Sequence, residues 1–202
     1  MNEKELYKEL GRLTNNKDDW HDSIEYVGSL LNHSSLKIKA KALWLLGEFG
    51  LQYPNEVKPY LDKIVDLLND ECAQIRERAI NALGRIGRAD FTLVCPHWEK
   101  IMLMAEDSAA SVRLYFIWAS ENIATNAPQL YKDSMEIFSL LLDDDNVKVR
   151  IEAPEIFRVI GKRIPEFVHP YLEKIKFLSE NDDSHIVRIH ARGAIRASMQ
   201  NN

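Results

Sequence analysis

The chain has 202 residues, of which 46% are apolar and 28% charged, and its 26 basic and 31 acidic side chains give a net charge of −5. These values fit one globular domain or one continuous array, and they exclude a disordered tail and a generally basic nucleic-acid coat. The two cysteines exclude a disulfide framework and a four-cysteine zinc site, and no apolar run is long enough to span a membrane. The charged start of the sequence predicts no signal peptide, so we expect a cytoplasmic protein without a membrane partner.

In chain order, residues 3–13 predict a leading helix, and a repeat follows it. An aliphatic residue followed by Lys or Arg recurs at spacings of 37, 37, 37 and 38 residues. The pairs are Ile38-Lys39, Ile75-Arg76, Val112-Arg113, Val149-Arg150 and Val187-Arg188. Apolar columns with helical spacing surround each pair, so each repeat predicts two helices, A and B, with one buried stripe.

The helix pairs can be bounded from these columns. The A helices are predicted at residues 20–31, 57–69, 94–106, 129–143 and 166–180. The B helices are predicted at residues 35–51, 72–88, 109–126, 146–163 and 184–199. With the leading helix, the sequence predicts about eleven helices and no strand.

The repeat resembles the HEAT repeat, in which a turn containing Asp is followed by Val-Arg and a small residue. Pro59, Pro96 and Pro170 share one A-helix column, and an Asp lies six residues before each Arg of the later repeats. The resemblance covers about residues 20–199. It implies an all-α fold, an α-α superhelix or right-handed solenoid of about five helical hairpins plus an N-terminal capping helix. We expect a single domain, 1–202, with the cap at 1–17 and units at 18–53, 54–90, 91–127, 128–164 and 165–202.

The resemblance also implies a ladder, because HEAT proteins use this Asp and Arg to join neighbouring repeats. The corresponding residues are Lys39, Asp70, Arg76, Asp107, Arg113, Asp144, Arg150, Asp182 and Arg188. We expect charge-assisted hydrogen bonds between repeats. The open alternative is that the basic members line a phosphate-binding surface.

A second B-helix stripe is the candidate binding surface. Counted from the basic residue, positions −1, +3, +7 and +10 form the core, and positions +2, +5 and +9 share another face that we expect to be concave. We call this second set the B-helix stripe. It comprises Lys41, Trp44, Glu48, Arg78, Asn81, Arg85, Tyr115, Trp118, Asn122, Glu152, Glu155, Val159, His190, Gly193 and Ala197.

Within and beside the stripe, aromatic and charged side chains are typical of binding anchors. The candidate binding residues are Lys41, Trp44, Arg78, Asn81, Arg85, Tyr115, Trp118, Asn122, Glu152, Glu155 and Arg158. The alternative for Trp44 and Trp118 is packing against neighbouring B helices. Trp20 and Trp98 fall in core columns of the A helices.

Charge is divided unevenly between the helices. The B helices as bounded above carry +11, so the remainder carries −16. The simplest interpretation is that this excess balances the acidic A helices and turns. The alternative is that it attracts an anionic partner, such as a nucleic acid or an acidic peptide.

No active-site motif is evident, and the six histidines show no metal-ligand spacing, so we expect no catalytic residue, metal or cofactor. One further resemblance, to HEAT-like DNA glycosylases for alkylated bases, rests on Trp118, Arg158 and Arg196. In that family a carboxylate follows the Trp by four residues, but here Asn122 takes its place, and we expect Glu121 to point to another face. The sequence therefore predicts a non-enzymatic monomeric module that holds a protein or peptide, with a nucleic-acid-binding HEAT-like protein as the alternative.

Overall fold

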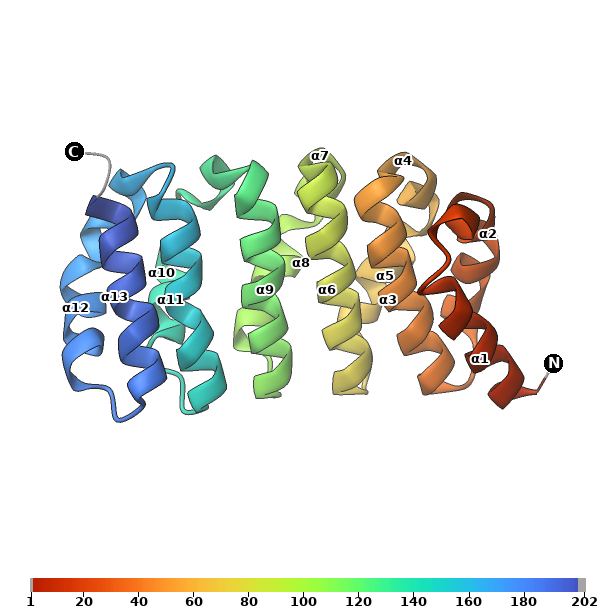
Figure 1. Ribbon diagram of the computed structural model, residues 1–202, viewed down its shortest axis with the longest axis horizontal. Coiled ribbons are helices and arrows are strands. Elements are labelled where there is room, and N and C mark those ends of the chain that lie inside the picture. The colour runs from red at the N-terminus through yellow and green to blue at the C-terminus, as the bar shows by residue number, and fades with distance from the viewer. Residues whose placement is uncertain (1, 200–202) are drawn as a thin grey trace. The chain divides into compact units, whose positions relative to one another are not determined.

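The structure, a computed structural model, describes residues 2–199, and this part of the chain contains α-helices, 3₁₀-helices and turns but no strand (Figure 1). It divides into two compact units, the first ending at Ile101 and the second beginning at Met102. Within residues 2–199 the expected leading helix and five A/B helix pairs are all present, which makes eleven helical elements when each interrupted A helix is counted once. This confirms the predicted all-helical repeat fold.

The leading helix and the B helices are continuous and lie within two residues of their predicted bounds. They are α1 (Glu3–Leu13), α3 (Leu36–Gln52), α6 (Ala73–Ala89), α9 (Ala110–Asn126), α11 (Val147–Gly161) and α13 (His185–Met199). In the first unit α1 and α6 pack on α3, and in the second α9 and α13 pack on α11 (Figure 1). The Asn2 and Glu5 side chains form a capping box at α1, and Ser35 and Asn146 cap α3 and α11.

The A helices are interrupted. Their α-helical parts are α2 (Trp20–Ser29), α4 (Pro54–Val57), α5 (Leu61–Asp66), α7 (Phe91–Val94), α8 (Trp98–Met102), α10 (Met135–Leu141) and α12 (Leu172–Asn181). Their 3₁₀ turns are η1 (Lys17–Asp19), η2 (Leu30–Asn32), η3 (Lys58–Tyr60), η4 (Leu67–Asn69), η5 (Cys95–His97), η6 (Leu103–Glu106), η7 (Pro128–Tyr131), η8 (Pro165–Phe167) and η9 (His169–Tyr171). Pro59, Pro96 and Pro170 each lie in the first turn of a 3₁₀ segment, because proline has no backbone N–H to continue an α-helix.

The core follows the predicted columns. The A-helix column Val27, Ile64, Ile101, Phe138 and Ile175 is completely buried, and so is the B-helix column at position −1. Trp20 is buried as expected, and its Nε1 donates to the Leu13 carbonyl at 2.6 Å. Trp98, expected in the core, is only half-buried. At Gly47 the B helices of the first unit approach closely, since a Cβ there would lie 2.9 Å from the Ala82 Cα.

The turns between A and B helices carry the ladder residues. In the second unit Arg113 donates through Nε and Nη2 to the Asp144 carboxylate at 2.6 and 2.8 Å, and Arg150 Nε donates to Asp182 at 3.0 Å. In the first unit Lys39 Nζ lies 3.4 Å from Asp70.

Each Arg of this set also donates to the backbone of its own turn. The carbonyl of the Asp six residues earlier accepts from Arg76, Arg113, Arg150 and Arg188. The carboxylates of Asp70, Asp107, Asp144 and Asp182 accept the N–H two residues later, at 2.7–2.9 Å. The Asp and the Arg six residues later therefore stabilise each A–B turn that contains them. Within the second unit, the Arg113–Asp144 and Arg150–Asp182 bonds also link one repeat to the next.

Candidate functional site

The B-helix stripe is a partly covered surface. Every member is half-buried except Ala197, which is buried. These side chains are therefore neither core residues nor fully solvated ones, as expected for a surface lined by neighbouring helices. The members in α3 and α6 belong to the first unit, and those in α9, α11 and α13 to the second.

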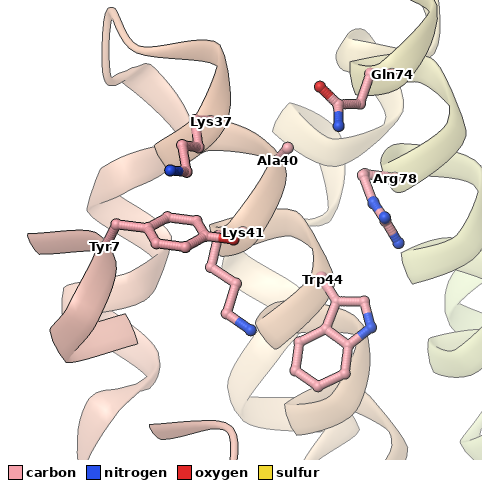
Figure 2. Close-up of a pocket in the computed structure, with 7 residues that line it drawn as sticks. All are labelled: Tyr7, Lys37, Ala40, Lys41, Trp44, Gln74 and Arg78. Atoms are coloured by element: carbon pink, nitrogen blue, oxygen red, sulfur yellow. The ribbon is translucent and has the colours of Figure 1, made fainter. Parts of the chain in front are cut away.

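In the first unit, the stripe borders a pocket of about 220 Å³ (Figure 2). It is lined by Tyr7 from α1, by Lys37, Ala40, Lys41 and Trp44 from α3, and by Gln74 and Arg78 from α6. The lining thus contains three cationic side chains and two aromatic rings, but no carboxylate.

Two of the cations lie over aromatic rings. The Lys37 Nζ is 4.1 Å from the centre of the Tyr7 ring, and the Lys41 Nζ is 4.3 Å from the centre of the Trp44 ring. Lys41 also donates to Thr14 Oγ1 at 2.7 Å. Burial, together with repulsion from Arg78, lowers the pKa of Lys41. The capping helix α1 and the residue that follows it therefore contribute Tyr7 and Thr14 to this site.

Arg85 and Asn81 complete the predicted residues of the first unit. Arg85 forms an ion pair with Glu48 across α6 and α3, and its guanidinium carbon lies 5.7 Å from the centre of the Trp44 ring. Trp44 is thus flanked by two cations of the chain itself. Asn81 is half-buried on α6, between the positions of Arg78 and Arg85.

In the second unit, the aromatic pair lies on α9. The Tyr115 and Trp118 rings meet edge to face, with their centres 4.8 Å apart and their planes at 78°. The Asn122 side-chain amide donates to the Trp118 carbonyl at 2.9 Å. This hydrogen bond directs the amide nitrogen to the backbone of its own helix.

Charged groups of α9, α11 and α13 interact with one another in the same unit. Glu155 accepts a hydrogen bond from Arg158 Nε, and its Oε1 lies 3.1 Å from His190 Nδ1. The Glu121 carboxyl is largely buried, and its Oε1 has no hydrogen-bond partner among the described residues. Burial, assisted by repulsion from Glu152 and Glu155 and partly offset by Arg158, raises the pKa of Glu121 from 4.5 to about 8.

The predicted binding residues of each unit therefore lie on B helices that pack against each other, α3 and α6 in the first unit and α9 and α11 in the second. Sequence reasoning omitted Tyr7, Lys37 and Gln74, and it set Glu121 aside. Lys37 could have been predicted from the sequence, because it lies one helical turn before Lys41 and therefore on the same side of the helix. The contribution of Tyr7 depends on how the capping helix packs against α3, which the repeat pattern does not specify.

Residues 2–199 offer neither a metal site nor a membrane span. No group of three or more His, Cys, Asp or Glu side chains in this range could hold a metal ion. None of the described helices combines the length and the apolar character that crossing a membrane requires.

No family model matches this sequence, and no curated protein does either. Solved structures do share the fold. A designed armadillo repeat protein in complex with the peptide (KR)4 is similar with a TM-score of 0.71 and 19% identity, over 95% of this chain and 91% of that one. Computationally designed armadillo repeat proteins for modular peptide recognition are similar with a TM-score of 0.64 and 19% identity, over 97% and 94%.

A natural protein complex has the fold as well. The complex of CpcE and CpcF of phycocyanin lyase from a Nostoc species is similar with a TM-score of 0.63 and 18% identity, over 86% of this chain and 98% of that one. At these identities the likeness shows a helical repeat fold of the armadillo and HEAT type. Since one of these structures belongs to a lyase, the fold alone does not distinguish a binding module from an enzyme component.

Proposed function

We propose that this chain is a binding module that holds a segment of a partner protein against the B-helix stripe. The observation that carries the proposal is the composition of that stripe: two tryptophans, a tyrosine and charged groups are half-buried along consecutive B helices of each unit. Aromatic rings in partly desolvated surroundings are the usual anchors of protein interfaces. We further propose that the stripe is concave, and that the chain acts as a monomer and catalyses no reaction.

The structural neighbours support peptide binding in general. The designed armadillo proteins recognise peptides, one of them the basic peptide (KR)4. The preference for a basic sequence does not carry over, since the first-unit pocket of this chain is itself basic.

The nucleic-acid alternative has less support. The second-unit part of the stripe carries Glu152 and Glu155, which repel a polyanion. For a glycosylase, Asn122 is held to the backbone of α9, and a pKa of about 8 keeps Glu121 mostly protonated at pH 7. Neither side chain then supplies the negative charge that the resemblance would require.

Affinity capture from native lysate, with and without nuclease treatment, tests the proposal, with Trp118→Ala as the main variant. Removing an anchor aromatic costs about 2 kcal/mol or more of binding free energy, so we expect capture to be lost. The stability cost should be about 1 kcal/mol, because the ring is only half-buried. Melting curves of both proteins measure that cost.

Phe177→Ala is the matched control. It removes an aromatic ring in the same unit, on α12 and 68% exposed, away from the stripe. Capture should survive this change. Equal capture by wild type and Trp118→Ala would place the partner elsewhere, and capture that disappears with nuclease would favour the nucleic-acid alternative.

A further inference from the structure

The pocket between α1, α3 and α6 has an unusual distribution of charge for a partly covered site. Three of its seven lining residues, Lys37, Lys41 and Arg78, are cationic, and none is acidic. Among the described residues, no carboxylate oxygen lies within 4.0 Å of the Lys37 or Lys41 ammonium. Glu48, the acidic residue of the stripe on α3, forms an ion pair with Arg85.

We propose that this pocket binds a carboxylate side chain in an acidic segment of the partner protein. The proposal rests on the proposed peptide-binding function and names the chemistry of the peptide. Lys37 and Lys41 line the pocket from α3 and Arg78 lines it from α6, so an anion in the pocket meets cationic residues of two helices (Figure 2). Charge-assisted hydrogen bonds to such an anion are the strong class of polar contact.

The aromatic rings make the opposite assignment, a basic ligand, unfavourable. A ring face attracts a cation, but Lys37 already lies over the Tyr7 ring, and Lys41 and Arg85 already lie over the Trp44 ring. A basic side chain entering the pocket would compete with these groups for the rings and would be repelled by their charges. The rings therefore hold the cations of the chain in place for an anion.

The hydrogen bonding and the charge environment of the Lys41 ammonium support an anionic occupant. Only one of its three ammonium protons has a hydrogen-bond acceptor among the described residues, the Thr14 hydroxyl. Its charge is partly desolvated and lies near the like charge of Arg78. A carboxylate in the pocket would relieve that repulsion and accept from the remaining donors.

A protein segment fits the surroundings better than a nucleic acid does. A nucleic acid needs a basic track that continues along its backbone. Here Lys37, Lys41 and Arg78 line a pocket of only about 220 Å³, and the stripe residues of α11 include two glutamates. A single acidic side chain or a short acidic stretch fits the volume of the pocket and complements its positive charge.

Fluorescence anisotropy with the full chain tests the inference. The probes are labelled oligoglutamate, oligoglutamine and oligolysine peptides and an oligothymidylate. We expect oligoglutamate to bind most tightly and to weaken with added salt, because the attraction is partly exposed to solvent. Lys37→Gln and Arg78→Gln should each weaken it about tenfold.

Lys63→Gln is the matched control, since it removes an exposed lysine of the same unit from α5, outside the pocket. Its affinity should equal that of wild type. If Lys63→Gln loses as much affinity for oligoglutamate as Lys37→Gln does, the attraction is diffuse and the proposed carboxylate site is wrong. Tighter binding of oligothymidylate than of oligoglutamate would also contradict the proposed site.

The same titrations separate this inference from the proposed function. If oligoglutamine binds as tightly as oligoglutamate and Trp44→Ala abolishes both, the module binds peptides but the carboxylate preference is wrong. If no peptide binds while partner capture still depends on Trp118, the pocket is wrong and the stripe function remains. If no peptide binds and partner capture does not depend on Trp118, both the carboxylate pocket and the proposed function of the stripe are wrong.

Discussion

Folding deprives the carboxyl group of Glu121 of most of its water. Burial and the nearby Glu152 and Glu155 carboxylates raise its pKa from 4.5 to about 8, so the folded state holds a proton that the unfolded state releases above pH 4.5. A raised acid pKa contributes stability that is fully present below the unfolded pKa and is lost as pH rises through the folded one. The slope is at most about 1.4 kcal/mol per pH unit for one proton.

Glu121→Gln should remove this dependence, because the amide resembles the protonated carboxyl in shape and carries no charge. We expect the free energy of unfolding of wild type, relative to Glu121→Gln, to fall between pH 4.5 and about 8 and to level off above that. Urea unfolding of both proteins at several pH values measures the difference. A difference that is constant across this range would show that the folded-state pKa is ordinary.

At the scale of the elements, Arg113 and Arg150 connect neighbouring repeats within the second unit. The two hydrogen bonds from Arg113 to Asp144 raise the pKa of the guanidinium. Burial alone would raise the pKa of Asp144, but its bonds from Arg113 and from the Asn146 amide lower it overall. The stabilisation from Asp144 is therefore present above its unfolded pKa and is lost as pH falls through the lower folded value.

Arg113→Ala should destabilise the chain by about 1–3 kcal/mol, since it removes charge-assisted bonds and leaves Asp144 partly buried without them. Urea unfolding measures this loss, and Arg163→Ala, which removes an exposed arginine of the same unit, should cost far less. Binding of the partner should change less than stability. A variant that unfolds like wild type but no longer captures its partner would assign these arginines to a binding surface.

The repeat period made most of the fold predictable. The position of one aliphatic-basic pair per repeat fixed every B helix to within two residues, because a buried stripe at helical spacing leaves little freedom for the boundaries. The interruptions of the A helices were not predicted. Pro59, Pro96 and Pro170 were identified as a column of the repeat, but their structural effect was not foreseen. Because proline lacks a backbone N–H, each of these three residues lies in a 3₁₀ turn that interrupts its A helix.

The candidate site was predictable only along the B helices. Register placed Lys41, Trp44 and Arg78 on one face, and these three line the pocket. Tyr7 comes from a helix outside the repeat, so no column could reveal it. The side-chain contacts that modify the site, such as Arg85 with Glu48 or Glu155 with His190, depend on the distance between neighbouring helices, which a sequence period does not encode.

At the scale of the whole molecule, the expected single domain has a measurable consequence. Helical repeats are stabilised by contacts with their neighbours, so a solenoid of this size can unfold as one cooperative unit or in parts. The chain forms two compact units, and the boundary between them falls at the last residue of α8, which is followed directly by η6. Because no loop separates the two units at this point, we expect a single transition.

The tryptophans allow the first unit to be observed by itself. Trp20, Trp44 and Trp98 lie there, and Trp118→Phe removes the one tryptophan of the second unit. In that background, Arg150→Ala breaks the link to Asp182 entirely within the second unit. If the chain is cooperative, this change lowers the urea midpoint reported by first-unit fluorescence as much as the midpoint reported by far-UV circular dichroism. A fluorescence midpoint that stays at its original value while the dichroism signal shifts would show that the two units unfold separately, and the chain would then consist of two domains.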